Sequence, residues 1–426
     1  MEQKIHFIGA GGVGVAGLAH LAADLGMEVT GSDVADSAML RSLQKRGIST
    51  WLGHSPERMG SPELVVYSAA VPENDPERVF AREHGIPEMR RGAFQNRLAL
   101  AFPVRVAISG SHGKTSTTAM LAHILRETGR EPAYLVGGIV NGWERSAAAG
   151  ARQIFVTEVD ESDASQSDFP ATLAIVLNVD DDHCWGLGGT AALEQTFLDL
   201  CRPASNILAW HSPTTERLFA TDSRTVFLET PLAASPELPL HGWQFRQDGA
   251  VAIAAAVQLG VPETNALAAL RTFPGVSRRM TERARSADGA RVLVEDYAHH
   301  PTELRATLDS LRETYPGRRI LVVFQPHRME RIERYGEQFA QLLSSTDWCG
   351  LVEPFGAWRT DGHRADARSL IAEHVTAPCV CLPNDPRSIA NAATPVWLDG
   401  SPAVLAVIGA GDVTQAVPLL QKNVEK

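Results

Sequence analysis

The sequence contains no long hydrophobic run, few cysteines and no excess of basic charge, and each absence excludes a class of protein. No apolar stretch approaches the roughly 20 residues of a membrane-spanning helix, and the N-terminus opens on a strand pattern rather than a signal peptide. The 5 cysteines are odd in number and lack CxxC spacing, so neither a disulfide framework nor a zinc site is expected. A net charge of −11 opposes binding to nucleic acid. These features predict a cytoplasmic protein without a membrane or nucleic-acid partner, and they leave its oligomeric state open.

The composition is that of a globular protein with several domains. The chain has 426 residues, of which 44% are hydrophobic and 21% are charged, enough for two or three domains. Short β-branched runs alternate with helical patterns, which is typical of α/β domains with mainly parallel sheets. We place the domains at residues 1–100, 101–275 and 276–426. Residues 207–241, rich in Pro, Ser and Thr, are expected to be irregular.

The most informative motif is a phosphate loop at residues 110–116. It follows the apolar run 104–108 and precedes a helical pattern, and it reads Gly110, Ser111, His112, Gly113, Lys114, Thr115, Ser116. In such loops backbone N–H groups surround phosphate oxygens, the lysine reaches the β- and γ-phosphates, and the hydroxyl of the next residue binds Mg²⁺. The long consensus has glycine where this chain has Ile108, so the match is to a shorter form. A glycine turn that caps a helix is the alternative.

A second glycine-rich loop lies near the N-terminus, directly after the strand pattern 4–8. Its glycines are Gly9, Gly11, Gly12 and Gly14, and Asp33 ends the next strand candidate. This arrangement is typical of dinucleotide sites but serves other nucleotide diphosphates equally well. A nicotinamide or flavin cofactor, another diphosphate and a structural turn all remain open. The triphosphate loop favours a diphosphate, because hydride transfer does not require ATP.

Acidic segments follow two further strand candidates of the middle domain. Glu158 belongs to the segment 156–163, and His183 ends the segment 178–183. Because parallel strands end at one edge of a sheet, both segments should lie beside the phosphate loop. Mg²⁺ takes one or two protein carboxylates together with phosphates and water. A magnesium site is therefore expected, with a solvated acidic loop as the alternative.

Taken together in this order, the motifs resemble those of the Mur ligases, over nearly the whole chain. Besides the two loops, the resemblance rests on Gly31-Ser32-Asp33, Ser68-Ala69-Ala70, the segments 158–163 and 178–183, Arg278-Arg279, the segments 295–303 and 324–328, and Gly409 to Asp412. It implies an α/β protein of three domains: a Rossmann-like UDP-binding domain, a central P-loop ATPase domain, and a Rossmann-like domain that positions the amino acid and closes over ATP.

The resemblance also implies roles for individual residues. The UDP-sugar would lie against Gly9, Gly11, Gly12, Gly14, Ser32, Asp33 and Ser68. ATP would lie against residues 110–116 and Arg279. Thr115, Glu158 and His183 would hold Mg²⁺, and Tyr297, His299, Arg328 and Arg331 would bind the amino acid. Lys114, His299, Arg328 and Arg331 would form the reaction centre.

The implied activity is ATP-dependent amide-bond formation between UDP-N-acetylmuramate and an amino acid, with L-alanine expected first. A carboxylate would attack the γ-phosphate of ATP, and an amine would then displace phosphate from the acyl phosphate. Lysine, Mg²⁺ and arginines suit this chemistry, because phosphoryl transfer needs positioning and charge neutralisation. His299 or His300 could accept a proton from the amine. A ligase for another UDP-sugar acid or amino acid, or a relative that binds without catalysis, are the alternatives.

Two departures from the family pattern bear on these expectations. By comparison with the length that the resemblance implies, about thirty residues of the central domain are expected to be missing between residues 228 and 241. Phe245 and Asp248 stand where the L-alanine-adding members have asparagines that contact the ATP base. An aromatic ring stacks on any base, whereas amides discriminate. We therefore expect a looser preference for ATP over GTP.

Overall fold

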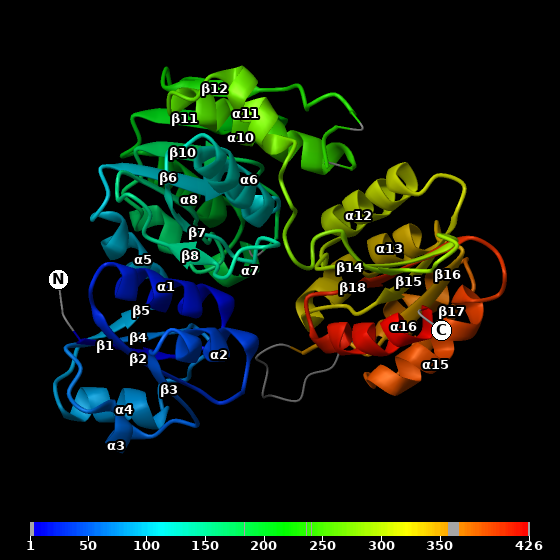
Figure 1. Ribbon diagram of the computed structural model, residues 1–426, viewed down its shortest axis with the longest axis horizontal. Helices are drawn as coiled ribbons and strands as arrows, with labels where there is room; N and C mark the ends of the chain where they lie inside the picture. The colour runs from blue at the N-terminus through cyan, green and yellow to red at the C-terminus, as the bar shows by residue number, and fades with distance from the viewer. Residues whose placement is uncertain (1–3, 183, 236, 240, 357–365, 425–426) are drawn as a thin grey trace. The chain divides into compact units, whose positions relative to one another are not determined.

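The chain folds as two compact units of α/β structure (Figure 1). The computed structural model describes residues 4–182, 184–235, 237–239, 241–356 and 366–424. One unit comprises Met1–Pro239 and Gln247–Pro274, and the other comprises Leu240–Arg246 and Gly275–Lys426. Three sheets with helices between their strands confirm the predicted α/β class.

The first sheet has five parallel strands in the order β3-β2-β1-β4-β5. Helices α1, α2 and α5 pack on one face, and α3 and α4 cover the other (Figure 1). The strands are β1 (Lys4–Ile8), β2 (Glu28–Asp33), β3 (Ser49–Leu52), β4 (Leu64–Tyr67) and β5 (Glu88–Arg90). The helices are α1 (Val13–Asp24), α2 (Ala38–Lys45), α3 (Pro56–Met59), α4 (Pro76–Glu83) and α5 (Arg91–Ala99).

The central sheet has seven strands in the order β12-β11-β10-β6-β9-β7-β8, and only β8 runs antiparallel to its neighbour. Its strands are β6 (Val104–Ser109), β7 (Ala133–Leu135), β8 (Ala147–Ala148), β9 (Ile154–Glu158), β10 (Leu173–Val176), β11 (Asn206–Trp210) and β12 (Thr225–Leu228). Its helices are α6 (Lys114–Glu127), η1 (Ser165–Asp168), α7 (Cys184–Leu187), α8 (Thr190–Cys201), α9 (Pro213–Phe219), α10 (Trp243–Gln258) and α11 (Glu263–Leu270).

The irregularity expected for residues 207–241 is wrong for residues 207–228, which belong to β11, α9, β12 and their short connections. Among the described residues that follow, no strand occurs before α10. The central sheet therefore ends at β12 on this side.

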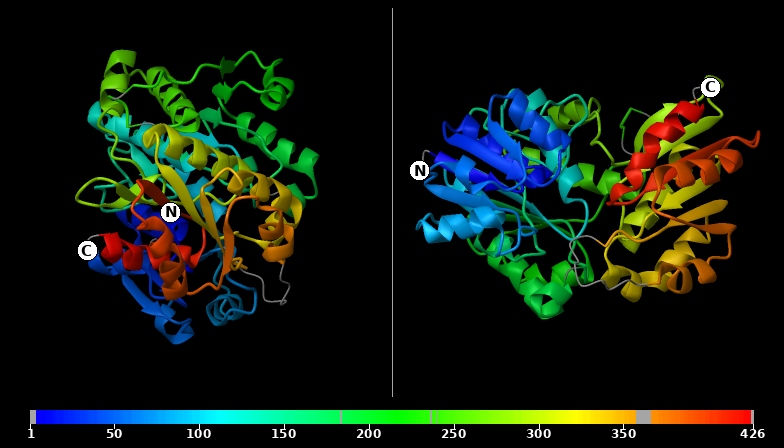
Figure 2. Two further views of the ribbon diagram at one scale, coloured as in Figure 1. Left: turned by 90° about the vertical axis from the view of Figure 1, so that its right-hand side faces the viewer. Right: turned by 90° about the horizontal axis from the view of Figure 1, so that it is seen from below.

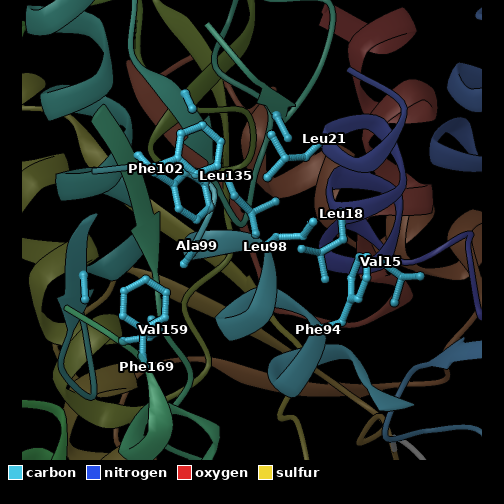
Figure 3. Close-up of a cluster of buried hydrophobic side chains, with 14 of the residues drawn as sticks. Val15, Leu18, Leu21, Phe94, Leu98, Ala99, Phe102, Leu135, Val159 and Phe169 are labelled. Carbon is cyan, nitrogen blue, oxygen red and sulfur yellow. The ribbon is translucent and has the colours of Figure 1, made fainter. Parts of the chain in front are cut away.

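A single hydrophobic core joins the first two sheets. Side chains of α1 and α5 meet the central sheet and its loops, with Leu18, Phe94 and Phe102 on one side and Leu135 and Phe169 on the other (Figure 3). All of these side chains are buried. Burial of a large apolar side chain stabilises a fold by about 1.5–3 kcal/mol, so this core is sufficient to hold both sheets in one unit.

The third sheet has the order β13-β14-β18-β15-β16-β17, and only β13 is antiparallel to its neighbour. Separate cores on its two faces pack against α12 and α13 and against α15 and α16 (Figure 2). The strands are β13 (Thr281–Arg285), β14 (Arg291–Asp296), β15 (Arg319–Phe324), β16 (Trp348–Val352), β17 (Cys379–Leu382) and β18 (Ala403–Ile408). The helices are α12 (Pro301–Thr314), α13 (Met329–Leu343), α14 (Ala367–Leu370), η2 (Ala372–His374), α15 (Pro386–Trp397), η3 (Asp412–Ala416) and α16 (Val417–Val424).

Within the described parts of the chain, none of the helices combines the length and the apolar character needed to cross a bilayer.

Packing at Gly17 tests the joint between the first two sheets. A Cβ atom at Gly17 of α1 would lie 2.5 Å from Leu135 Cδ1 of β7 and 3.1 Å from Ser146 Oγ. Overpacking a core costs about 1–3 kcal/mol, so Gly17→Val should lower the free energy of unfolding, measured in urea, by that amount. Gly186→Val is the control, since Gly186 has no neighbouring atom within 4 Å. Equal stability of the two variants would contradict the packing described for α1.

Candidate active site

The predicted phosphate loop lies between a strand and a helix, as its sequence indicates. The loop leaves β6 after Ser109, and α6 begins at Lys114. Gly110 and Gly113 have φ values of +147° and +86°, which a residue with a Cβ rarely adopts. A Cβ at Gly110 would also lie 2.9 Å from Leu177 Cβ. Glycine is therefore required at both positions, and the helix N-terminus presents backbone N–H groups suited to an anion.

The segment after β10 holds this loop in place. The side-chain amide of Asn178 accepts from the backbone N–H of His112 at 2.9 Å and donates to the carbonyl of His112 at 3.0 Å. Ser111 Oγ accepts from the backbone N–H of Asp180 at 2.9 Å. The sequence placed this segment beside the loop but did not identify Asn178 as its anchor.

Lys114 forms an ion pair with the buried carboxylate of Glu161. Its Nζ lies 2.8 Å and 3.0 Å from the two carboxylate oxygens of Glu161 and 2.5 Å from the carbonyl oxygen of Gly110. Burial opposes the charge of Lys114, but the carboxylates of Glu161 and Asp160 outweigh it and raise the pKa of Lys114. Burial also raises the pKa of Glu161 to about 7, against the attraction of Lys114. Sequence reasoning did not assign a role to Glu161.

Thr115 and Glu158 form an oxygen pair at the same edge of the sheet. The Thr115 hydroxyl donates to Glu158 Oε2 at 2.8 Å. Gly137 leaves room for this carboxylate, since a Cβ there would lie 1.8 Å from Glu158 Oε1. One hydroxyl and one carboxylate are the kind of protein ligands that Mg²⁺ takes beside phosphates, so the donor set fits the predicted metal. His183, the third predicted ligand, lies outside the described residues.

The N-terminal glycine loop is closed by the carboxylate of Asp33. Asp33 Oδ2 accepts from the backbone N–H of Gly11 at 2.8 Å. A Cβ at Gly11 would lie 2.8 Å from the Asp33 carboxylate, and one at Gly9 would lie 3.0 Å from Ser68 Cβ. Gly9, Gly11, Asp33 and Ser68, four of the residues predicted to bind the UDP-sugar, thus lie together.

Ser32 contributes to the glycine loop through its backbone rather than its side chain. Its carbonyl accepts from the backbone N–H groups of Gly9 and Ala10, each at 2.9 Å. Its hydroxyl is buried and donates to Glu77, a carboxylate that also lies 3.1 Å from Nδ1 of His54. The hydrogen bond that His54 makes to this carboxylate raises the pKa of His54. A hydroxyl used in this way is not presented to a ligand.

Arg91 lies between the glycine loop and the acidic segment of the central sheet. Its Nη1 lies 3.3 Å from the position that a Cβ of Gly14 would take, and its Nη2 donates to Asp160 Oδ2 at 2.7 Å. Burial raises the pKa of Asp160, but Arg91 and Lys114 outweigh it and hold that pKa well below its usual range. Arg91 belongs to none of the sequence motifs and was not predicted.

In the second unit, two of the residues predicted to bind the amino-acid substrate follow β14. The rings of Tyr297 and His299 lie 5.4 Å apart, centroid to centroid. His299 Nδ1 lies 3.0 Å from the carbonyl oxygen of Tyr297 and 3.1 Å from Glu303 Oε2. The guanidinium carbon of Arg279 lies 5.0 Å from the centre of the Tyr297 ring. His300 instead caps α12, where its Nδ1 accepts from the backbone N–H of Thr302 at 3.3 Å.

Arg328 and Arg331 lie at the start of α13 in the same unit. Arg328 has a φ of +68° immediately before the helix, and its backbone N–H donates to the carbonyl of Phe355 at 3.1 Å. A non-glycine residue in this conformation is often found at functional sites. Arg331 is buried, and its Nη1 lies 3.5 Å from Nδ1 of His327.

Phe245 and Asp248, at the two positions where the resemblance implies asparagines, both lie on α10. Asp248 is the buried one. Its Oδ1 lies 2.6 Å from the position that a Cβ of Gly113 would take. A carboxylate thus stands beside the last glycine of the phosphate loop.

Comparison with known proteins identifies the family. Residues 4–103 match the catalytic domain of the Mur ligase family, residues 108–208 match the Mur ligase middle domain, and residues 278–425 match the Mur ligase glutamate ligase domain. A UDP-N-acetylmuramate--L-alanine ligase from Thiobacillus denitrificans is 34% identical over an alignment that covers 98% of each chain. This chain belongs to the Mur ligase family. A further relative with the same name, from Halorhodospira halophila, is 37% identical over 86% of this chain and 82% of its own.

Solved Mur ligase structures share the fold. The UDP-N-acetylmuramate-alanine ligase of Thermotoga maritima superposes with a TM-score of 0.83 at 24% identity, over 98% of each chain. A murein peptide ligase from Psychrobacter arcticus gives a TM-score of 0.72 at 23% identity, over 99% of this chain and 98% of its own. These likenesses confirm the Mur ligase architecture, while the roles of individual residues stay predictions.

The anchoring of the phosphate loop by Asn178 can be tested directly. Asn178→Ala leaves the His112 N–H without this acceptor, which costs about 1–3 kcal/mol for a buried group. We expect the dissociation constant for ATP, measured by calorimetry, to rise about tenfold, equivalent to about 1.4 kcal/mol. Asn206→Ala is the matched control, because Asn206 is exposed at the start of β11. An unchanged dissociation constant for Asn178→Ala would show that the loop does not depend on this anchor.

Proposed function

We propose that this chain is an ATP-dependent ligase that joins L-alanine to UDP-N-acetylmuramate in the synthesis of peptidoglycan precursors. The observation that carries the proposal is the phosphate loop with Lys114 and the Thr115–Glu158 pair at one sheet edge. Relatives named for this reaction, 33–37% identical, support the choice of substrates. ATP and a UDP-sugar are cytoplasmic compounds, so we place the reaction in the cytoplasm.

The first step is transfer of the γ-phosphoryl group of ATP to the muramate carboxylate. The N–H groups at the start of α6 and the Lys114 ammonium bind the phosphates and neutralise the charge that develops on them. The glycine loop around Gly11 binds the diphosphate of the UDP-sugar. Arg91, between that loop and Asp160, adds a positive charge near both anions.

The proposal includes Mg²⁺. Thr115, Glu158 and His183 would be its protein ligands. When bound, the ion would neutralise phosphate charge and orient the oxygens of the triphosphate. Gly137 provides the space for the Glu158 carboxylate, because a Cβ at this position would displace it from Thr115.

The second step is attack of the alanine amine on the acyl phosphate, with release of inorganic phosphate. The amine must be unprotonated to attack. His299 is held by Glu303 and by the carbonyl of Tyr297, and it can accept a proton from the amine or orient the amine for attack. Arg328 and Arg331 would bind the carboxylate of the amino acid, which arginine can hold through two parallel hydrogen bonds.

The alternative of a binding protein without catalysis finds little support at the phosphate loop. A triphosphate and a metal require an ammonium, a hydroxyl and a carboxylate, which are present in Lys114, Thr115 and Glu158. A protein that only binds a UDP-sugar needs none of these groups. The looser base preference expected from Phe245 and Asp248 stays a prediction.

The proposed function is tested with Lys114→Ala. ADP release in the presence of UDP-N-acetylmuramate, L-alanine and Mg²⁺ should fall at least a hundredfold, equivalent to about 2.7 kcal/mol or more. The dissociation constant for UDP-N-acetylmuramate should stay within about twofold, because its proposed site lies on the first sheet. Wild-type turnover by the variant would refute the assignment of the phosphate loop. Turnover with glycine or serine but not alanine would redirect the proposal to another amino acid.

The proposed magnesium site is tested at Gly137. A Cβ placed 1.8 Å from Glu158 Oε1 must displace that carboxylate. Changes beside a metal ligand cost about 10–100-fold in metal affinity, so Gly137→Ala should raise the Mg²⁺ concentration for half-maximal activity by that factor. Binding of UDP-N-acetylmuramate is the internal control and should not change. An unaltered Mg²⁺ requirement would remove Glu158 from the metal site.

A further inference from the structure

Lys114 directs its hydrogen bonds to groups of the protein itself. Its ammonium contacts both oxygens of Glu161 at 2.8 and 3.0 Å, the carbonyl oxygen of Gly110 at 2.5 Å and, more distantly, that of Ser111 at 3.4 Å. An ammonium group has three donors. To bind a phosphate oxygen, Lys114 must therefore give up or share at least one of these contacts.

Glu161 is the contact that carries charge. Its side chain is 1% exposed, whereas that of Lys114 is 19% exposed. A buried carboxylate is costly without a cation, so Glu161 holds Lys114 more strongly than a carbonyl does. It also repels an incoming triphosphate, because both are negative.

We propose that the Glu161 carboxylate competes with the triphosphate of ATP for Lys114, so that ATP binds by displacing this carboxylate from the lysine. Glu161 is thus a positioning residue that lowers the affinity of the phosphate loop for nucleotides and sets how readily they leave. The inference rests on the proposed function only in that the loop binds ATP.

The neighbouring acid provides a natural control. Asp160 lies next to Glu161 in sequence, but its carboxylate pairs with Arg91 at 2.7 Å. Asp160 also attracts Lys114 by its charge, but the hydrogen bonds of Lys114 go to Glu161. Removal of either carboxylate changes the net charge of the segment equally, whereas only removal of the Glu161 carboxylate also takes these hydrogen bonds away.

The experiment compares Glu161→Gln, Glu161→Asp and Asp160→Asn by calorimetry with Mg²⁺ and ATP at pH 8.5. Glutamine keeps the shape of the side chain and removes its charge, while aspartate keeps the charge and shortens the reach. The dissociation constant for ATP should fall at least threefold in Glu161→Gln and by less in Glu161→Asp. In Asp160→Asn it should fall by less than in Glu161→Gln, because this change removes a charge near Lys114 but none of its hydrogen bonds.

Steady-state kinetics separate this role from a merely structural one. In Glu161→Gln the KM for ATP should fall by the same factor as the dissociation constant, while kcat should not rise, because nucleotide leaves more slowly. Unchanged or weaker ATP binding in Glu161→Gln, or an equal gain in Asp160→Asn, would overturn the inference. Binding of UDP-N-acetylmuramate shows whether each variant is folded. If Glu161→Gln is not folded, the dissociation constant for ATP in Glu161→Asp is compared with that of the wild-type chain instead. If the wild-type chain binds no ATP, the proposed function fails instead.

Discussion

The hydrophobic core shared by the first two sheets is the constraint on which the arrangement of the site depends. Leu18 and Phe94, on helices of the first sheet, are buried in the same cluster as Leu135 and Phe169 of the central domain (Figure 3). The ion pair between Arg91 and Asp160 also crosses this joint, but partly exposed pairs contribute about 0–1 kcal/mol. Several buried apolar side chains contribute far more. The core therefore holds the sheets together, and the ion pair is a consequence of their placement.

Parallel topology then determines which residues meet. β6, β9 and β10 are neighbouring parallel strands, so the segments that follow them emerge at one edge of the central sheet. The phosphate loop, the acidic segment with Glu158 and Glu161, and the anchor Asn178 come together there. The charges that meet there are paired: Lys114 pairs with Glu161, and Asp160 pairs with Arg91.

Much of this could be predicted from local pattern, and the rest depends on contacts that pattern does not reveal. The strand, glycine loop and helix around Lys114 were predictable, because glycines and apolar runs act locally. The pairing of Lys114 with Glu161 was not, because it depends on the register between β6 and β9. The hydroxyl of Ser32 faces Glu77, which follows two strands later. Residues 207–228 were wrongly expected to be irregular, although Ser212 and Thr215 form a capping box that begins α9, with Pro213 in its first turn.

The position of Arg91 has a consequence for the entropy of the reaction. Because the shared core joins the first two sheets, the glycine loop and the acidic segment belong to one body, and Arg91, which lies against Gly14 and bonds to Asp160, spans the fixed distance between them. A carboxylate anchored through its nucleotide and a phosphate anchored in the second loop would react as if within one molecule. Such an arrangement can reach effective molarities of about 10⁵–10⁸ M. Each substrate still loses its translational freedom when it binds, but folding has already fixed the distance between the two loops, so the bound groups need little further ordering to react.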